Sequence, residues 1–415
     1  MMRTFLISLV LTSQGIAVNA QQVASIDVDM TDATRGWHVP VSINLDSLTK
    51  LPAARLSLIE QRGDKTVEIP IQVQDGSPRR LHWLIPPIEL QRNNATRQFK
   101  LIGRAPHKTN KMEASKENGA LTLQANNKNL LRYQFETVYP PAGVDTAFKR
   151  NAFIHPLWSP HGQVLTRIQP PDHYHHYGIW NPWTHVLYKN DTVDFWNIGG
   201  KKGTVRFAGF ANIMEGPVYA GFTARHDHVV FQKNGGEEVA LKEWQTVRIY
   251  RPAPDSDYYI ADIDIEMQCA TKEPVLLLEY RYGGLGWRTT EKWDRNNSEV
   301  ITSEGKTRKD ADGSRAAWCI VQGAIDNDYA GVVMMSYPAN YNHPEPLRIW
   351  PEDQYNRGDM FANFSPTKDR DWLLEPGKKY LLKYRLLVYN GKYTPEKAGA
   401  AWQQFAQPLK MKIGE

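Results

Sequence analysis

The alternation of apolar and polar residues over positions 258–267 constrains the fold of this chain more than any other feature. The run Tyr-Tyr-Ile-Ala-Asp-Ile-Asp-Ile-Glu-Met places apolar side chains at alternate positions along much of its length. Because successive side chains of a β-strand point to opposite faces of a sheet, this pattern predicts a strand with one buried and one solvated face. Such strands are typical of antiparallel sheets.

Short alternating segments separated by turn residues also fill the N-terminal part of the chain. They are 25–29, 39–43, 54–59, 67–73, 81–85 and 98–102. Their regular spacing, without a helical period, predicts an immunoglobulin-like β-sandwich over residues 23–105. The polar, lysine-rich residues 106–118 are expected to form a linker.

Strand patterns continue through residues 119–415. They cover 121–123, 130–137, 205–209, 243–250, 258–268, 275–281, 316–321, 331–336 and 380–389. Only residues 394–405 have a helical pattern, with Thr394 as the N-cap and Pro395 at the first helical position. We therefore expect an all-β protein, in which the immunoglobulin-like domain is followed by a large antiparallel β-sandwich with a concave face and one C-terminal helix.

The first 20 residues indicate the compartment. They combine one positive charge, an apolar core over 5–11 and small residues at the cleavage position, which is typical of a secretory signal peptide. No later stretch approaches the ~18 apolar residues of a membrane helix, so we expect a periplasmic or secreted protein without membrane insertion. In an oxidising compartment Cys269 and Cys319 could pair, or each could remain a buried free thiol. The 50 basic and 45 acidic residues are interspersed, which disfavours nucleic acid as a partner.

A cluster of histidines predicts the position of a site. Six of the twelve histidines lie within residues 155–185. In an extended backbone His173 and His175 would point to one side and His176 to the other. Histidine titrates closest to neutral pH, so we expect these three residues to be catalytic acids or bases, with Asp172 contacting the substrate.

A metal site is an alternative interpretation of the same cluster. His173 and His175 could bind a metal from one strand face, but a zinc site needs three or four ligands. The candidates for the remaining ligands are Asp172, His343, His226 and His228. No spacing here matches a known ligand signature, so we predict no cofactor and keep a divalent metal as the alternative.

Tryptophans stand beside the histidines. Flat rings with a polar edge suit the C–H faces of sugars, which makes Trp180, Trp183 and Trp196 candidate substrate-binding residues. Packing in the protein core is the alternative for each of them.

Two further segments could complete such a site. In residues 279–288 a strand ends in a glycine-rich turn, which would expose Arg288 to clamp a carboxylate and place Glu279 as a general base. The glycines could equally serve backbone needs alone. A rigid loop between prolines carries His343, a further catalytic candidate, and Arg348, a further substrate-binding candidate.

Several of these segments together resemble a known family. The matching pieces are 155–157, Gly162, 166–167, 172–180, 194–196, 283–288, 342–344 and 364–366. They resemble exported bacterial proteins labelled "methane oxygenase PmoA", over about residues 130 to 390. The resemblance implies a β-sandwich similar to the galactose-mutarotase supersandwich of sugar epimerases, lyases and some hydrolases. The label's methane oxidation is not carried over, because a membrane monooxygenase subunit would contain several apolar spans and the mature chain contains none.

These features predict an exported carbohydrate-active enzyme that acts on an oligosaccharide or polysaccharide. In a lyase, a histidine or tyrosine would remove the proton next to a uronate carboxylate that Arg288 neutralises. In a glycoside hydrolase, Glu279 and a second acid, Asp172 or Asp194, would flank the glycosidic oxygen. The alternatives are a glycan-binding protein without catalysis and a metal-dependent enzyme with a histidine-rich site.

Overall fold

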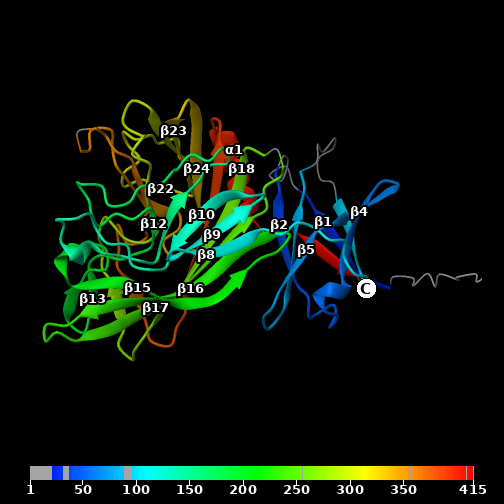
Figure 1. Cartoon of the computed structure of the whole chain (residues 1–415), viewed down its shortest axis with the longest axis horizontal. Coiled ribbons are helices and arrows are strands. Elements are labelled where there is room, and N and C mark those ends of the chain that lie inside the picture. Colours follow the sequence, from blue (N-terminus) through cyan, green and yellow to red (C-terminus); the bar gives the residue numbers. More distant parts are fainter. Residues whose placement is uncertain are drawn as a thin grey trace, which may run out of the picture.

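The fold consists of a smaller N-terminal lobe and a larger lobe, both built from strands (Figure 1). The structure, a computed structural model, describes residues 21–30, 37–87, 96–254, 256–355, 357–407 and 409–414. The signal peptide expected at residues 1–20 lies outside this part. Among the described residues the one α-helix is α1 (Pro395–Ala406), so the predicted all-β class with a single C-terminal helix is confirmed. Within the same residues, no helix has the length and apolar character needed to cross a membrane.

The smaller lobe is a sandwich of two antiparallel sheets. The strand order is β29-β1-β7-β3-β4 in one sheet and β2-β6-β5 in the other. The strands are β1 (Gln22–Asp29), β2 (Val39–Asn44), β3 (Ser57–Arg62), β4 (Lys65–Ile69), β5 (Ile71–Gln74), β6 (Arg80–Ile85), β7 (Thr96–Ile102) and β29 (Met411–Gly414). Alternate side chains of both sheets, among them Ile26, Leu58, Trp83 and Phe99, form its core.

Two strands occupy the range 67–73, where the sequence predicts one. Pro70 separates β4 from β5, because proline has no N–H to donate to a strand ladder. β4 pairs with β3 in the larger sheet, whereas β5 pairs with β6 in the smaller one. The chain therefore crosses between the two sheets at this proline.

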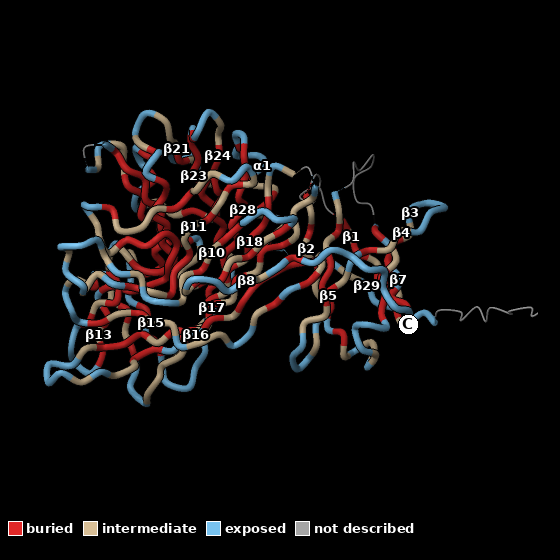
Figure 2. The backbone as a smooth tube through the Cα atoms, viewed as in Figure 1, coloured by how far each residue is buried: buried red, intermediate tan, exposed pale blue. Residues whose placement is uncertain are grey.

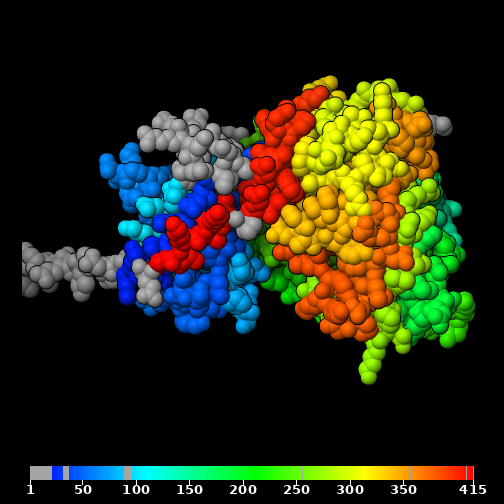
Figure 3. Space-filling view, turned by 180° about the vertical axis from the view of Figure 1, so that it is seen from behind, coloured from blue at the N-terminus to red at the C-terminus, as the bar shows by residue number. Residues whose placement is uncertain are grey.

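The structure differs from the predicted domain boundaries in two places. The chain returns to the smaller lobe at its C-terminal end, where β29 pairs with β1 and Ile413 lies opposite Ile26. Figure 3 shows the C-terminal residues in red, with α1 against the larger lobe and β29 against the smaller one. The pairing covers the edge of β1, which would otherwise expose unpaired backbone groups.

The second difference lies in the range 106–118, which is expected to be a linker. Residues 113–117 form a strand there, and their polar side chains suit the outer edge of a sheet.

The larger lobe is dominated by two sheets that face each other across the main apolar core (Figure 2). One has nine strands, in the order β22-β25-β26-β20-β12-β11-β10-β9-β8. Its strands are β8 (Glu113–Glu117), β9 (Ala120–Ala125), β10 (Lys128–Gln134), β11 (Phe153–Leu157), β12 (Ile179–Trp180), β20 (Gly286–Arg288), β22 (Arg315–Ala316), β25 (Glu345–Ile349) and β26 (Phe361–Phe364).

The other large sheet has eight strands, in the order β15-β16-β17-β18-β28-β24-β23-β21. Its strands are β15 (Gly203–Met214), β16 (Tyr219–Phe231), β17 (Glu237–Tyr250), β18 (Tyr258–Cys269), β21 (Ser298–Thr302), β23 (Trp318–Ile325), β24 (Asp328–Ser336) and β28 (Tyr380–Asn390). β18 contains the alternating run that predicts a strand over 258–268. Cys269 at its end is half-buried and free, and Cys319 is buried and free.

Smaller elements complete the larger lobe. A four-stranded sheet contains β13 (Val186–Tyr188), β14 (Asp191–Val193), β19 (Val275–Leu277) and β27 (Trp372–Leu374). The helix α1 begins as predicted, since the Thr394 hydroxyl accepts a hydrogen bond from the backbone of Lys397 and Pro395 follows it. Its buried residues Ala398 and Ala401 pack with apolar side chains of β23, β24 and β28.

Candidate functional site

Neighbouring strands of the nine-stranded sheet place a second set of side chains on the face opposite the main core. β25, β26, β20 and β12 are adjacent in this sheet, and successive residues of each point to opposite faces. The side chains in the main core are Leu347, Ala362, Trp287 and Ile179. Their neighbours in the strands are Arg348, Phe361, Arg288 and Trp180. The loops before β12 and between β25 and β26 add the remaining residues of the site.

His176 lies among aromatic rings on this second face. Its side chain is 1% exposed, and its ring centre lies 5.3 Å from that of Trp180 and 5.1 Å from that of Phe361. Burial, together with the charges of His175 and Arg288, lowers the pKa of His176 well below its usual value. The imidazole is therefore neutral at physiological pH, and its Nδ1 has no hydrogen-bond partner among the described residues.

Asp172 connects the histidine loop to Arg288. Nδ1 of His173 donates to Oδ2 of Asp172 at 2.9 Å, and Nη2 of Arg288 lies 3.7 Å from Oδ1 of the same carboxylate. Burial opposes ionisation of this carboxyl, but the hydrogen bond from His173 and the charge of Arg288 lower the pKa of Asp172 to about 2. Asp172 is thus a permanent anion that holds one ring nitrogen of His173. The ring of His173 also lies beside Trp350 and Tyr355, with centre distances of 4.9 and 4.7 Å.

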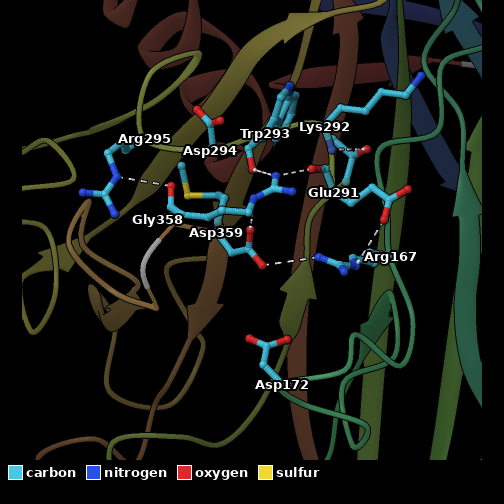
Figure 4. Close-up of polar contacts among 12 residues, drawn as sticks. Arg167, Asp172, Glu291, Lys292, Trp293, Asp294, Arg295, Gly358 and Asp359 are labelled. Atoms are coloured by element: carbon cyan, nitrogen blue, oxygen red, sulfur yellow. Dashed lines mark hydrogen bonds and ion pairs between the residues drawn. The ribbon is translucent and has the colours of Figure 1, made fainter.

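Asp359 pairs with three arginines, Arg288, Arg167 and Arg357, of which Figure 4 labels Arg167. Its Oδ2 accepts from Nη2 of Arg288 at 2.6 Å and from Nη1 of Arg167 at 3.3 Å. In Figure 4, Arg167 lies between Asp359 and Glu291, and the carboxylate of Asp172 is turned toward them. Burial lowers the pKa of Arg288 to about 10 against the opposing effect of the two aspartates, so the guanidinium stays charged at neutral pH. Its Nη1 has no partner among the described residues.

His175 lies next to the other two histidines of the loop. Its ring centre is 5.4 Å from that of His173 and 4.7 Å from that of His176. Burial, followed by the charges of His173 and Arg150, lowers the pKa of His175 to about 3. Like His176, it is a neutral ring at physiological pH. Of the three histidines, only His173 is bound to a carboxylate in the described structure.

The structure brings together most of the residues predicted from the sequence. The cluster contains Asp172, His173, His175, His176, Trp180, Trp196 and Arg288. Arg348 borders it, because its Nη2 donates to the hydroxyl of Tyr282 at 3.1 Å and Trp350 donates to the same oxygen at 3.0 Å. Nε of Arg348 is a third buried nitrogen without a partner among the described residues, beside Nδ1 of His176 and Nη1 of Arg288.

Three predicted residues lie elsewhere. Glu279 is exposed because the predicted strand 275–281 ends early, at Leu277, and its backbone N–H is bound to Asp371. The side chain of His343 approaches Ser336 and stacks near Trp402 of α1. Trp183 is fully buried in the main core. The predicted catalytic roles of Glu279 and His343, and the substrate-binding role of Trp183, therefore do not fit this cluster.

Asp359, Trp350, Tyr355 and Arg167 belong to the site although the sequence does not single them out as site residues. Trp350 follows β25 and Asp359 precedes β26. Both reach Arg288 only because β25 pairs with β26 and β26 pairs with β20. Arg167 lies in one of the segments that carry the family resemblance, which is the one signal that could have identified it.

The pair His226 and His228, considered as metal ligands, binds a buried carboxylate instead. Nδ1 of His226 and Nε2 of His228 lie 2.9 and 3.0 Å from the two oxygens of Glu243, and Asn181 donates to the same group at 3.0 Å. Burial opposes ionisation, but the hydrogen bonds from the two histidines lower the pKa of Glu243 to about 2. Across the described residues, no three His, Cys, Asp or Glu side chains are arranged to hold a metal ion.

Residues 120–403 match the model described as "Family of unknown function (DUF6807)". The chain belongs to this family. The match includes the whole cluster and excludes the N-terminal sandwich. No curated protein matches the chain in sequence.

Solved structures of larger proteins are similar to the chain at low identity. One is an alpha-mannosidase from Enterococcus faecalis V583, with a TM-score of 0.46 and 9% identity over 94% of this chain and 46% of the other. Another is a protein in the glycosyl hydrolase family 38 from Enterococcus faecalis, with a TM-score of 0.48 and 9% identity over 94% of this chain and 47% of the other. The chain thus spans about half the length of each.

Proposed function

We propose that this protein is an exported carbohydrate-active enzyme, in which His173 transfers a proton and Arg288 holds a carboxylate of the substrate. The predicted signal peptide supports export. The observation that carries the proposal is the double contact of Asp172, which binds His173 at 2.9 Å and faces Arg288 at 3.7 Å. A proton-transfer group and an anion-binding group are thereby fixed next to each other.

His173 has the surroundings of a general base. A carboxylate on Nδ1 fixes the tautomer and orientation of an imidazole, which leaves Nε2 as the reactive nitrogen. Trp350 and Tyr355 beside the ring supply flat surfaces of the kind that sugars stack on. Because His175 and His176 are neutral, neither places a second positive charge beside the ring of His173.

Arg288 has the surroundings of an anion clamp. Its side chain is 1% exposed, it lies over the ring of Trp350 at 4.5 Å, and its Nη1 is unpartnered among the described residues. A guanidinium with one donor left can bind a carboxylate and stabilise the negative charge that develops when the adjacent carbon loses a proton.

These two groups suit β-elimination from a uronate. The base takes the proton from the carbon next to the carboxylate, the C–O bond to the leaving sugar breaks, and a carbon–carbon double bond forms. The leaving oxygen then receives a proton from the imidazolium or from water. The product is an unsaturated uronate.

The carboxylates of the cluster favour elimination over hydrolysis. A glycoside hydrolase needs one carboxyl group with a raised pKa as the general acid. The pKa of Asp172 is lowered instead, and Asp359 is engaged by Arg288 and Arg167. Neither carboxyl is therefore arranged as a proton donor, and we propose a polysaccharide or oligosaccharide lyase.

The test is a substrate panel applied to the purified mature protein. Uronate-containing polysaccharides are compared with neutral oligosaccharides and aryl glycosides, and the ultraviolet absorbance of unsaturated uronates is recorded beside the release of reducing ends. We expect both signals from a uronate substrate and neither from neutral substrates. Release of reducing ends without ultraviolet absorbance would show that the protein is a glycoside hydrolase and not a lyase.

A second candidate is a glycan-binding protein without catalysis. It is favoured by Tyr355, whose side chain is 42% exposed beside the ring of Trp350, as in a stacking platform for sugars. Saturable binding of an oligosaccharide, with no turnover of any substrate and no dependence on His173, would support this function over the enzyme.

A further inference from the structure

A cavity separate from the Asp172–His173 site lies in the larger lobe beside β15. It has a volume of about 440 Å³ and is bounded by two short helices, η3 (Thr146–Phe148) and η4 (Ile198–Gly200), and by the start of β15. This volume falls within the usual size of small-ligand sites. Hydroxyl and amide groups of Thr146 and Asn151 line it together with a group of cations.

The cations of this cavity exceed their counterions. Lys149, Arg150, Lys201 and Arg206 all line it. Lys201 is paired with Asp145 at 2.9 Å, and Arg206 is paired with Glu237. Lys149 and Arg150 have no carboxylate within ion-pair distance among the described residues. Two of the four cations that line the cavity therefore have no ion-pair partner among the described residues.

Arg150 is the stronger indication of a ligand. It is 3% exposed, its Nη2 donates to the carbonyl oxygen of Phe195 at 2.6 Å, and its Nε has no partner in the described part of the chain. A buried charge is costly unless an opposite charge and hydrogen bonds compensate it. Arg150 thus lines the cavity as a buried cation without an ion-pair partner among the described residues, and a bound oxyanion would compensate this charge.

We propose that this cavity binds a monosaccharide-sized oxyanion, such as a uronate or a sulfated or phosphorylated sugar, through Arg150 and Lys149. Arg150 supplies the buried charge and Lys149 an exposed one at the rim. The hydroxyl of Thr146 also lines the cavity, where it can meet a hydroxyl of the ligand. This assignment does not depend on the reaction proposed for His173.

The cavity shares a wall with the histidine loop. The guanidinium of Arg150 lies 5.9 Å from the ring centre of Tyr177, and the hydroxyl of Tyr177 donates to the backbone oxygen of Phe148 in η3. The ring of Phe148 lies 5.8 Å from that of Tyr174. A ligand in the cavity therefore contacts the segment that supports the loop carrying His173 and His176.

The test is calorimetric titration of the full mature protein at constant ionic strength. The probes are sodium glucuronate, sodium sulfate and inorganic phosphate, which distinguish the possible anionic groups, and glucose is the neutral control. We expect saturable binding of at least one oxyanion and none of glucose. Lys149→Ala should weaken this binding about threefold and Arg150→Gln about tenfold. Lys128→Ala, an exposed lysine on the β9–β10 hairpin, should leave it unchanged.

Two further variants show whether the oxyanion binds in this cavity or at the Asp172–His173 site. His173→Asn changes the proposed catalytic site. It must leave unchanged the oxyanion affinity that depends on Lys149 and Arg150. If Arg150→Gln fails to fold, as judged by circular dichroism, then Lys149→Glu decides, because its side chain is exposed. The proposal is overturned if no oxyanion binds, if glucose binds equally well, or if the binding is insensitive to Lys149 and is lost in His173→Asn.

Discussion

Nδ1 of His173 lies 2.9 Å from a carboxylate oxygen of Asp172, the residue immediately before it in the chain. Two side chains that are adjacent in sequence can form such a contact in many loop conformations, so this contact alone does not identify a functional site. Its meaning comes from Arg288, which a distant strand places 3.7 Å from the same carboxylate. The aspartate therefore ties a local histidine to a guanidinium that only the tertiary structure brings near.

The first prediction concerns this pair. We expect His173→Ala to lower kcat by about 10²- to 10⁴-fold on the uronate substrate, because general acid–base catalysis typically contributes that much. Asp172→Asn should also lower kcat, since the amide no longer fixes the imidazole tautomer. Steady-state kinetics with the ultraviolet assay measures both effects.

The controls for this prediction are residues that the structure places outside the cluster. Glu279→Gln and His343→Ala should retain kcat within about twofold, because neither side chain contacts the cluster in the structure. Full activity of His173→Ala, or a loss confined to Glu279→Gln, would contradict the assignment of the base.

The second prediction concerns the carboxylate clamp. Arg288→Lys keeps the charge but loses the planar fork, so we expect a higher KM for substrates with free carboxylates. A methyl-esterified substrate should respond much less to the change. Arg225→Lys, at an exposed position on β16, is the matched control. It should leave the KM of both substrates unchanged. If Arg288→Lys raised the KM of the free-acid and the methyl-ester substrate equally, Arg288 would not bind the substrate carboxylate.

Much of the fold follows from patterns within single strands. The alternation over 258–267 and the cap at Thr394 depend only on local residues, and both appear as predicted. Pairing between distant segments carries no such local signal. β29 is a run of four residues that pairs with β1, at the other end of the chain, so its place in the smaller lobe could not be predicted.

The site was predictable to a similar degree. The histidines of the cluster lie close in sequence, and an unusual local density of one residue type is visible without a structure. Asp359 and Trp350 are single residues in a loop, and they reach Arg288 only because β25, β26 and β20 are neighbours in the sheet. Strand order is set by long-range packing, which explains why the sequence could suggest Glu279 although the structure places it outside the cluster.

The third prediction is a loss of stability in mild acid. Burial, with the charges of Arg248 and Arg80, lowers the pKa of His82 to about 3, and burial also lowers that of His176. Below pH 6.5 the unfolded chain protonates both groups while the folded protein does not, so the free energy of unfolding decreases as the pH falls. Each histidine contributes about 1.4 kcal/mol per pH unit until the pH reaches its folded pKa.

Urea denaturation at pH 7.5, 6 and 5 measures this dependence. His82→Gln removes one of the titrating groups and should reduce the slope by about 1.4 kcal/mol per pH unit. A free energy of unfolding that stays constant between pH 6.5 and 5 would contradict the neutral state of the buried histidines.

The fourth prediction concerns the buried carboxylate of Glu243. Glu243→Ala leaves His226, His228 and Asn181 without their shared acceptor, and removal of one partner from a buried charged network costs about 3–5 kcal/mol. Guanidinium denaturation should show this loss. Lys242→Ala, the exposed neighbour on the same strand, should change the free energy of unfolding by no more than about 0.5 kcal/mol. A variant at Glu243 as stable as wild type would mean that the network is not ionic.

The fifth prediction concerns the C-terminal strand. A chain that stops after Gln407 lacks β29, so β1 keeps only its pairing with β7 and the smaller lobe loses Met411, which packs against its core. We expect amide exchange in β1 to accelerate at least tenfold, equivalent to about 1.4 kcal/mol of local stability, with no change in β17 and β18 of the larger lobe. Lys412→Ala retains β29, so its amide exchange in β1 should equal that of the full chain. Mass spectrometry of peptides from β1, β17 and β18 gives the comparison, and unchanged exchange in β1 would show that β29 contributes nothing to the smaller sandwich.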